Sequence, residues 1–294
     1  MNILSFDIEE WYLETSLHGG RPHKMAEFDS TLDAVLEKMA EVGATGTFFC
    51  LGKMASDYPA VIRKIISAGH DVGCHSNNHK WLTKMTPEEL RRDTSDAIHA
   101  LEDVAGQKVN SFRAPAFSIT PNTIWAIEVL SECGIEIDAS IFPAARDFGG
   151  YPSFPQDTPC QVSHNGVVLK EYPVTIMSMA GKRIAFSGGG YFRLLPYAIM
   201  NKEMKRRNSS YNICYFHLAD LIPEQKKMMS KVEYEDYFNE SGTLKNRLVR
   251  YIKNNISTGN SFEKLKRLLT DESFVSIKEA NKLVNWDETA IIIL

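Results

Sequence analysis

The sequence has no long apolar run and no leader-like start. No apolar run approaches the roughly 18 residues needed to cross a bilayer, so we expect no transmembrane segment. The first residues, MNILSFDIEEW, show neither the basic nor the apolar region of a signal peptide. We therefore expect a location in the cytoplasm, or facing it.

Cysteine is scarce and scattered. The five cysteines (Cys50, Cys74, Cys133, Cys160 and Cys214) form no CxxC pair, and their number is odd. This favours buried, reduced thiols over a disulfide framework or a thiolate metal site. Cys74 precedes His75 directly, but neighbouring strand residues point to opposite faces, so we do not expect it to share a ligand set with His75.

An excess of positive charge is also missing. The 33 basic and 37 acidic residues give a net charge of -4, which argues against a dedicated nucleic-acid-binding protein. Between residues 201 and 270 the balance reverses, with 14 basic and 8 acidic residues. We interpret this region as a solvated helical face, with attraction to an anionic or lipid-phosphate partner as the alternative.

Short apolar runs alternate with helical patterns along the chain, which indicates βα units and a parallel sheet. The helix expected at 30–43 begins at Ser30 and ends at Gly43, a second covers 58–69, a third is opened by the Thr86–Glu89 capping box, and a fourth begins at Thr120-Pro121. Strands are expected at 3–8, 45–51, 70–75, 110–115, 134–140 and 211–217.

The second half of the chain differs in composition and in pattern. Residues 141–190 are rich in Pro and Gly, and we expect a long ordered loop with extra strands in VVLKEYPVTI and KRIAFSG. A helix at 195–207 precedes the last core strand, and from about 223 the pattern is helical. We expect two apolar stripes of this tail to be buried against the core. They comprise Leu244, Leu248, Tyr251 and Ile252, and Phe262, Leu265, Leu268 and Leu269. The closing AIIIL is either a last packed segment or an oligomer contact.

The stretch GCHSNNHKWL carries two histidines, His75 and His79, four residues apart. If the chain turns helically after His75, both rings project from one face and can bind one metal ion. Two surface histidines spaced by chance are the alternative.

Four further polar clusters stand where expected strands end, which is where parallel α/β barrels collect their chemistry. Asp7 and Glu9 share one face of the first strand, whereas Glu10 points the other way. The other clusters carry Arg113, Asp138 and His217. Each has an ordinary structural explanation, such as a helix cap, an ion pair or a core histidine. Together with His75 and His79 they are the parts of a metal-assisted hydrolase.

The order FD-x-E, H-S-x-x-H, R-x-P, D-x-S and a strand ending in His resembles the polysaccharide deacetylases of carbohydrate esterase family 4, the NodB-homology group. The resemblance covers roughly residues 1–220. FDIEEW and FSGGGYFRLLPY resemble the branch found in exopolysaccharide and O-antigen gene clusters, including those associated with exosortase systems.

The resemblance implies an α/β fold, a distorted (β/α)7 barrel, in a single domain over 1–294 with a helical extension at 221–294. It implies hydrolysis of N-acetyl groups from an amino sugar, with Asp7 as the base that takes a proton from metal-activated water. Glu9, His75 and His79 would bind the metal, Zn²⁺ first and Co²⁺, Ni²⁺, Mn²⁺ or Fe²⁺ otherwise. Arg113 would orient Asp7, His217 would be the acid with Asp138 at its ring, and the Ala116 N–H would be an oxyanion donor.

The chain departs from the family pattern at three places. The first motif is Asp-Ile-Glu where many members have adjacent aspartates, so the metal ligand is the longer Glu9. Ala116-Phe117 replaces the usual Pro-Tyr, and Ile141-Phe142 stands where a tryptophan often follows the fourth motif.

Two other functions stay open at this point. One is a deacylase or deformylase for a small or lipid-linked amide, with peripheral contact to the lipid-linked substrate; the other is an inactive sugar-binding homologue. The sequence does not choose between a free polymer, a lipid-linked repeat and a nucleotide sugar, and it leaves the oligomeric state open.

Overall fold

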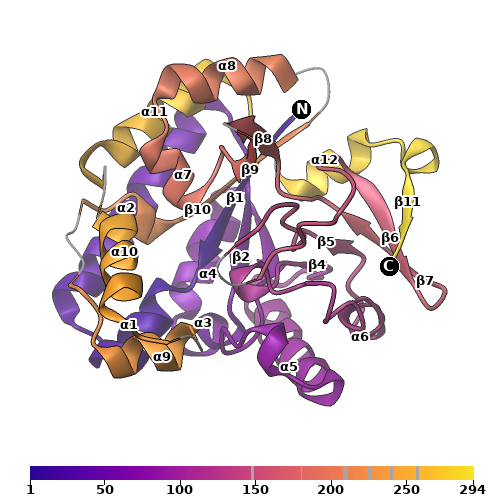
Figure 1. The fold of residues 1–294 in the computed structure, drawn as a ribbon, viewed down its shortest axis with the longest axis horizontal. Helices are drawn as coiled ribbons and strands as arrows, with labels where there is room; N and C mark the ends of the chain where they lie inside the picture. Colours follow the sequence, from indigo (N-terminus) through magenta and orange to yellow (C-terminus); the bar gives the residue numbers. More distant parts are fainter. Residues whose placement is uncertain (147–148, 180, 208–210, 224–226, 239–240, 256–257) are drawn as a thin grey trace.

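Seven parallel strands form the centre of the molecule, with helices around them (Figure 1). In spatial order they are β10 (Asn212–His217), β1 (Asn2–Ile8), β2 (Thr47–Cys50), β3 (Asp71–Cys74), β4 (Ser111–Phe112), β5 (Ile137–Asp138) and β7 (Val167–Glu171). The computed structural model describes residues 1–146, 149–179, 181–207, 211–223, 227–238, 241–255 and 258–294. Within these ranges, none of the helices has the length and apolar character that a membrane span requires.

The two outer strands of this run, β7 and β10, are connected by the segments that follow β7. The Tyr211 hydroxyl donates to the Pro173 carbonyl at 2.9 Å, and the Ser187 hydroxyl donates to the Ile213 carbonyl at 2.6 Å. A separate hairpin of β8 (Ile176–Met179) and β9 (Lys182–Ala185) lies between these segments. The α/β architecture and the distorted (β/α)7 barrel are confirmed.

The strands form because their residues are apolar and bury both faces. All seven residues of β1, NILSFDI, are buried, as expected for a strand inside a parallel barrel. Polar groups then follow at the carboxyl ends, where strand pairing stops.

Helices cover the outside of the strands (Figure 1). They are α1 (Glu10–His18), α2 (Pro22–Val42), α3 (Gly52–Asp57), α4 (Pro59–Ser67), α5 (Pro87–Ala105), α6 (Ala126–Glu132), α7 (Gly189–Leu194), α8 (Tyr197–Arg207), α9 (Lys231–Phe238), α10 (Leu244–Asn255), α11 (Ser261–Asp271) and α12 (Ile277–Leu283). The capping box at the start of α5 is confirmed: the Glu89 N–H donates to the Thr86 hydroxyl, and the Thr86 N–H donates to the Glu89 carboxylate.

Two expected helix starts are wrong. The helix expected from Ser30 begins eight residues earlier, at Pro22, and the Ser30 hydroxyl bonds to the Glu27 carbonyl of its own helix. The helix expected from Thr120 begins at Ala126. Thr120 instead forms a turn, in which it accepts from the Thr123 N–H and donates its own N–H to the Thr123 hydroxyl.

The sequence interpretation missed one strand. β6 (Cys160–His164) pairs antiparallel with β7 through a turn at Asn165-Gly166, where both φ angles are positive, 47° and 82°. Asn-Gly between two strands is the usual signal of such a hairpin. The closing AIIIL contributes β11 (Ile291–Ile293), which pairs parallel with β6, while Ile291 and Ile293 stay exposed.

The two apolar stripes of the tail have different environments. On α11, Leu265, Leu268 and Leu269 are buried in the same core cluster as Leu4 and Phe6 of β1, as expected. On α10, by contrast, Leu244, Leu248 and Ile252 are exposed, so the expectation that this stripe is buried is wrong.

The packing of α11 gives a stability prediction. Leu268→Ala removes a fully buried side chain from the shared core and should lower the free energy of unfolding by about 2–5 kcal/mol. Leu248→Ala on the exposed stripe is the matched control and should change it by less than about 0.5 kcal/mol. Urea unfolding of both variants measures the difference, and equal effects would contradict the shared core.

Candidate metal centre and active site

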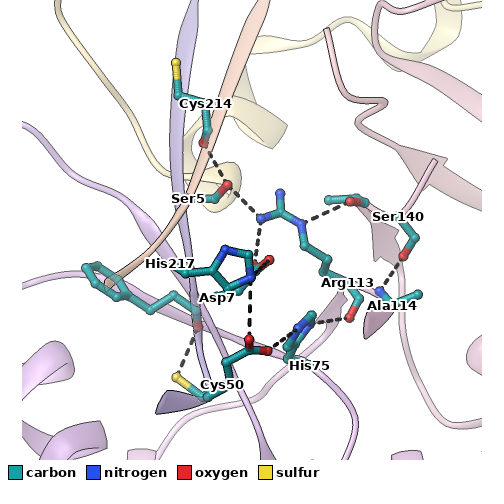
Figure 2. Close-up of polar contacts among 12 residues, drawn as sticks. Ser5, Asp7, Cys50, His75, Arg113, Ala114, Ser140, Cys214 and His217 are labelled. Atoms are coloured by element: carbon teal, nitrogen blue, oxygen red, sulfur yellow. Dashed lines mark hydrogen bonds and ion pairs between the residues drawn. The ribbon is translucent and has the colours of Figure 1, made fainter. Parts of the chain in front are cut away.

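The carboxyl ends of β1, β3, β4 and β10 bring the expected polar side chains to one edge of the barrel. Asp7 lies near the end of β1 beside His217, its register partner at the end of β10. Glu9 follows β1, His75 follows β3, and Arg113 follows β4. Figure 2 shows Asp7, His75, Arg113 and His217 gathered together. Parallel strands cause this convergence, because their carboxyl ends meet at the same edge.

Glu9, His75 and His79 form a cluster suited to a metal ion. Their ligand atoms lie within 4.8 Å of one another. Glu9 Oε2 is 2.7 Å from His79 Nε2 and 3.5 Å from His75 Nε2. Burial raises the pKa of Glu9, but His79, His217 and His75 together lower it well below its usual range, so this carboxylate is ionised.

The tautomer of His75 supports the metal reading. His75 Nδ1 lies 2.8 Å from the Arg113 carbonyl oxygen, which can only accept, so Nδ1 carries the hydrogen. In the neutral ring, Nε2 then presents its lone pair toward the Glu9 carboxylate. An imidazole nitrogen and a carboxylate oxygen this close need a cation between them, either a proton on the ring or a metal ion, and the buried Glu9 Oε2 has no hydrogen-bond partner among the described residues. The donor set of two imidazoles and one carboxylate therefore fits a divalent metal such as zinc.

The two histidines meet through a loop, and the expected helical turn is absent from this described segment. His75 directly follows β3, and the chain then takes positive φ angles at Ser76 (67°) and His79 (59°). The His79 N–H donates to the Ser76 hydroxyl at 3.0 Å, which closes the loop. The two rings end 5.4 Å apart. The expected pairing of the rings is found, but its helical explanation is wrong.

Asp93 of α5 supports this loop, and sequence reasoning gave it no role. One carboxylate oxygen accepts from the Asn77 N–H at 2.8 Å. Asp93 is buried, and burial raises its pKa while the Asn77 and Asn78 hydrogen bonds lower it.

Asp7 is held by a buried arginine. Arg113 has no exposed surface, and its Nη1 lies 2.9 Å from Asp7 Oδ1 and 2.9 Å from the Ser5 hydroxyl. Its Nε donates to the Ala139 carbonyl at 3.1 Å, and its guanidinium lies over the Phe49 ring. Figure 2 shows the guanidinium directed toward Ser5 and Asp7. This geometry suits the orienting role that the resemblance implies for Arg113.

His217 faces both first-motif carboxylates. Its Nε2 lies 3.8 Å from Asp7 Oδ2 and 3.6 Å from Glu9 Oε1. Its Nδ1 lies 3.2 Å from Asp220 Oδ2. Burial lowers the pKa of His217, but Glu9, Asp220 and Asp7 outweigh it and raise that pKa to about 10. With Nδ1 held by Asp220, the ring directs Nε2 toward the centre of the site, the position from which a proton could be donated.

The expected contact between Asp138 and the ring of His217 is wrong; Asp220 occupies that place. Asp138 ends β5, which does not pair with β10, whereas the His217 ring at the end of β10 is held by Asp220, three residues further along the chain. Asp138 instead accepts from the Ser140 hydroxyl at 2.5 Å and is the register partner of Glu171 on β7. Burial raises the pKa of both carboxyls, and the charge of Asp138 raises that of Glu171 further.

The glycines of FSGGGYFRLLPY let α7 approach β10. A Cβ on Gly188 would lie 2.2 Å from Tyr215 Cε1, a distance that real contacts do not reach. This close approach brings Arg193 of α7 within 3.7 Å of Asp220, the partner of His217. The motif therefore supports Asp220, which in turn holds the His217 ring.

Two further groups border the site. The turn Pro115–Phe117 contains a positive φ of 57° at Ala116, a strained value for a residue other than glycine. Glu10 is buried and accepts from the Ala219 N–H at 3.0 Å. Burial and the charge of Glu9 raise the pKa of Glu10 to about 7.

Two families match the chain. Residues 23–137 match the polysaccharide deacetylase family, and residues 139–282 match a domain of unknown function, DUF3473. Among curated relatives, a chitooligosaccharide deacetylase of Azorhizobium caulinodans is 37% identical over 87 residues, which are 29% of this chain and 41% of the relative. A peptidoglycan-N-acetylglucosamine deacetylase of Bacillus cereus is 29% identical over 117 residues, which are 36% of this chain and 42% of the relative. The chain thus spans less than half the length of these relatives.

Solved structures share the fold. A structure from Mycobacterium smegmatis, described as a polysaccharide deacetylase, has a TM-score of 0.64 at 18% identity and covers 100% of this chain and 92% of its own. A family 4 pseudoenzyme from Bacillus anthracis has a TM-score of 0.50 at 12% identity and covers 95% of this chain and 64% of its own. Residues 23–137 thus belong to the polysaccharide deacetylase family, and residues 139–282 match DUF3473.

Proposed function

We propose that this protein is a metal-dependent hydrolase that removes N-acetyl groups from amino sugars of a polysaccharide or of its biosynthetic precursor. The observation that carries the proposal is the meeting of Asp7, the Glu9/His75/His79 cluster and His217 at one edge of the barrel. A base, a metal-ligand set and a protonated imidazole are the three things that amide hydrolysis requires.

Glu9, His75 and His79 would hold a divalent metal, which would polarise the acetyl carbonyl as a Lewis acid and lower the pKa of water. Asp7 accepts a proton from the attacking water, and Arg113 holds the Asp7 carboxylate in place through Nη1. The water oxygen forms a bond to the acetyl carbon, and the carbon–nitrogen bond breaks. His217 donates its Nε2 proton to the leaving nitrogen, so the products are acetate and the free amino sugar.

The residues present in the site favour an active enzyme over an inactive homologue. The base Asp7, the acid His217 and all three metal ligands are present together, which favours catalysis over mere sugar binding. An acetate-release assay on a chitooligosaccharide, a lipid-linked N-acetyl saccharide and a nucleotide sugar tests the activity and identifies its substrate class. No acetate from any of them, with zinc bound, would count against the proposal.

Substitutions of the two first-motif carboxylates, Asp7 and Glu9, should differ in their effect on metal content. Asp7→Asn should keep close to one metal per chain and lose roughly 10²–10⁴-fold in kcat/KM, because an amide cannot accept the water's proton. Glu9→Ala and His79→Ala should instead lose metal, and excess zinc should partly restore their activity. Metal analysis beside acetate release measures both properties. If Asp7→Asn loses its metal while Glu9→Ala keeps it, the two roles are reversed or Glu10 takes part.

The pH profile should depend on Asp220. The His217 ring must be protonated to act as the acid, so activity falls as pH rises through its pKa, and Asp220 raises that pKa. Asp220→Asn should therefore move the basic limb of the kcat/KM profile to lower pH. Asp138→Asn is the matched control: it removes a carboxylate that lies away from His217 and should leave the position of this limb unchanged. A shift with Asp138→Asn alone would restore Asp138 as the ring partner.

A further inference from the structure

Helix α10 presents an apolar face to solvent. Leu244, Leu248 and Ile252 follow one another at four-residue spacing and therefore lie on one side of the helix. They are 64%, 46% and 50% exposed, and Val249 beside them is 44% exposed. A contiguous exposed apolar stripe of this kind usually marks an interaction surface.

The same helix carries only positive charge. Residues 241–262 contain no Asp or Glu, and their charged residues are Lys245, Arg247, Arg250 and Lys253. Lys245 is exposed and lies at the helix position between Ile252 and Val249, within the apolar face. Arg247 donates to the Met229 carbonyl at 3.2 Å, which ties α10 to the preceding segment.

The charge pattern distinguishes two possible partners for the apolar face of α10, a second copy of the chain and an anionic lipid surface. A two-fold dimer centred on α10 would place the helix against its own copy. Positive charge would then face positive charge, because 241–262 contain no carboxylate. The carboxylates of the neighbouring α9 already have partners, since Glu233 accepts from the Ser230 N–H and Glu235 accepts from the Gly242 N–H. An anionic lipid surface offers both complements, negative headgroups for the cations and acyl chains for the leucines. We propose that α10 docks the protein on anionic membranes, with Leu244, Leu248 and Ile252 at the boundary between headgroups and acyl chains.

The position of α10 connects this surface to the site. Helix α9 packs beside α10 (Figure 1). Tyr234 of α9 is buried against Trp81, and the same cluster contacts Ala116. Trp81 follows the metal ligand His79 by two residues, so α9 lies between the docking helix and the catalytic loops. If the proposed function holds, a docked enzyme presents its site near the membrane surface, which suits an N-acetyl saccharide on a lipid carrier.

Vesicle binding by the full chain, measured without any saccharide, tests the docking proposal. We expect sedimentation with vesicles that contain phosphatidylglycerol, little binding to vesicles of phosphatidylcholine alone, and weaker binding as salt is raised. Leu248→Gln with Ile252→Gln, and separately Lys245→Glu, should each weaken binding roughly tenfold or more. All three positions are exposed, so thermal unfolding should match that of the unmodified protein.

The matched control lies on α12, where Lys282 and Leu283 are also exposed. Lys282→Glu with Leu283→Gln makes the same chemical changes away from α10 and should leave vesicle binding intact. Absence of binding to anionic vesicles, or equal loss in the control, would overturn the proposal. So would a dimer in solution that the α10 variants dissociate. Acetate release from a soluble substrate should be unchanged in the α10 variants, which keeps failure of docking distinct from failure of the deacetylase proposal.

Discussion

A guanidinium with no exposed surface lies beneath the candidate site, and the arrangement of the site depends on it. Arg113 contacts Asp7 and Ser5 on β1 and the Ala139 carbonyl after β5, so one side chain links strands on both sides of β4. Removing such a charge from water costs several kcal/mol unless partners compensate it. Its backbone carbonyl also holds His75 Nδ1 and so sets the tautomer of the ring that faces Glu9. Asp7 and His75, the proposed base and one proposed metal ligand, are thus oriented by one residue.

The site is assembled from both halves of the chain. His75, His79 and Arg113 lie in the region that matches the deacetylase family, whereas His217 and its partner Asp220 lie in the region that matches DUF3473. The physical link is the pairing of β10 with β1, which places His217 beside Asp7 in register. Glu171 adds a second link, because it pairs with Asp138 and accepts from the Ile141 N–H. The second half therefore supplies His217, the proposed acid, and supports the strand ends of the first.

The tail divides into two parts with different energetics. Helix α11 gives its leucines to the common core, so its burial stabilises the fold. The apolar face of helix α10 stays exposed, although ordering its backbone costs as much conformational entropy per residue as ordering that of α11. A partner that covers this face would recover the missing hydrophobic stabilisation. The combination of exposed leucines with a run of cations is what directs our interpretation to an anionic lipid surface.

Several features follow from the sequence by itself, because they depend on residues close together in the chain. The apolar runs ILSFDI and YNICYFH predict buried strands, and the polar residues at their ends, Asp7, Glu9 and His217, predict a site. The Thr86 capping box is equally local. Tertiary structure alone decided the partner of His217, since Asp138 and Asp220 can be told apart only once strand order places β5 away from β10. It also decided that positive φ angles, and no helix, bring His75 and His79 together. Finally, two similar apolar stripes predicted the same burial for α10 and α11. A stripe is buried only where the fold provides a surface to cover it. The fold provides that surface for α11, whereas the stripe of α10 stays exposed.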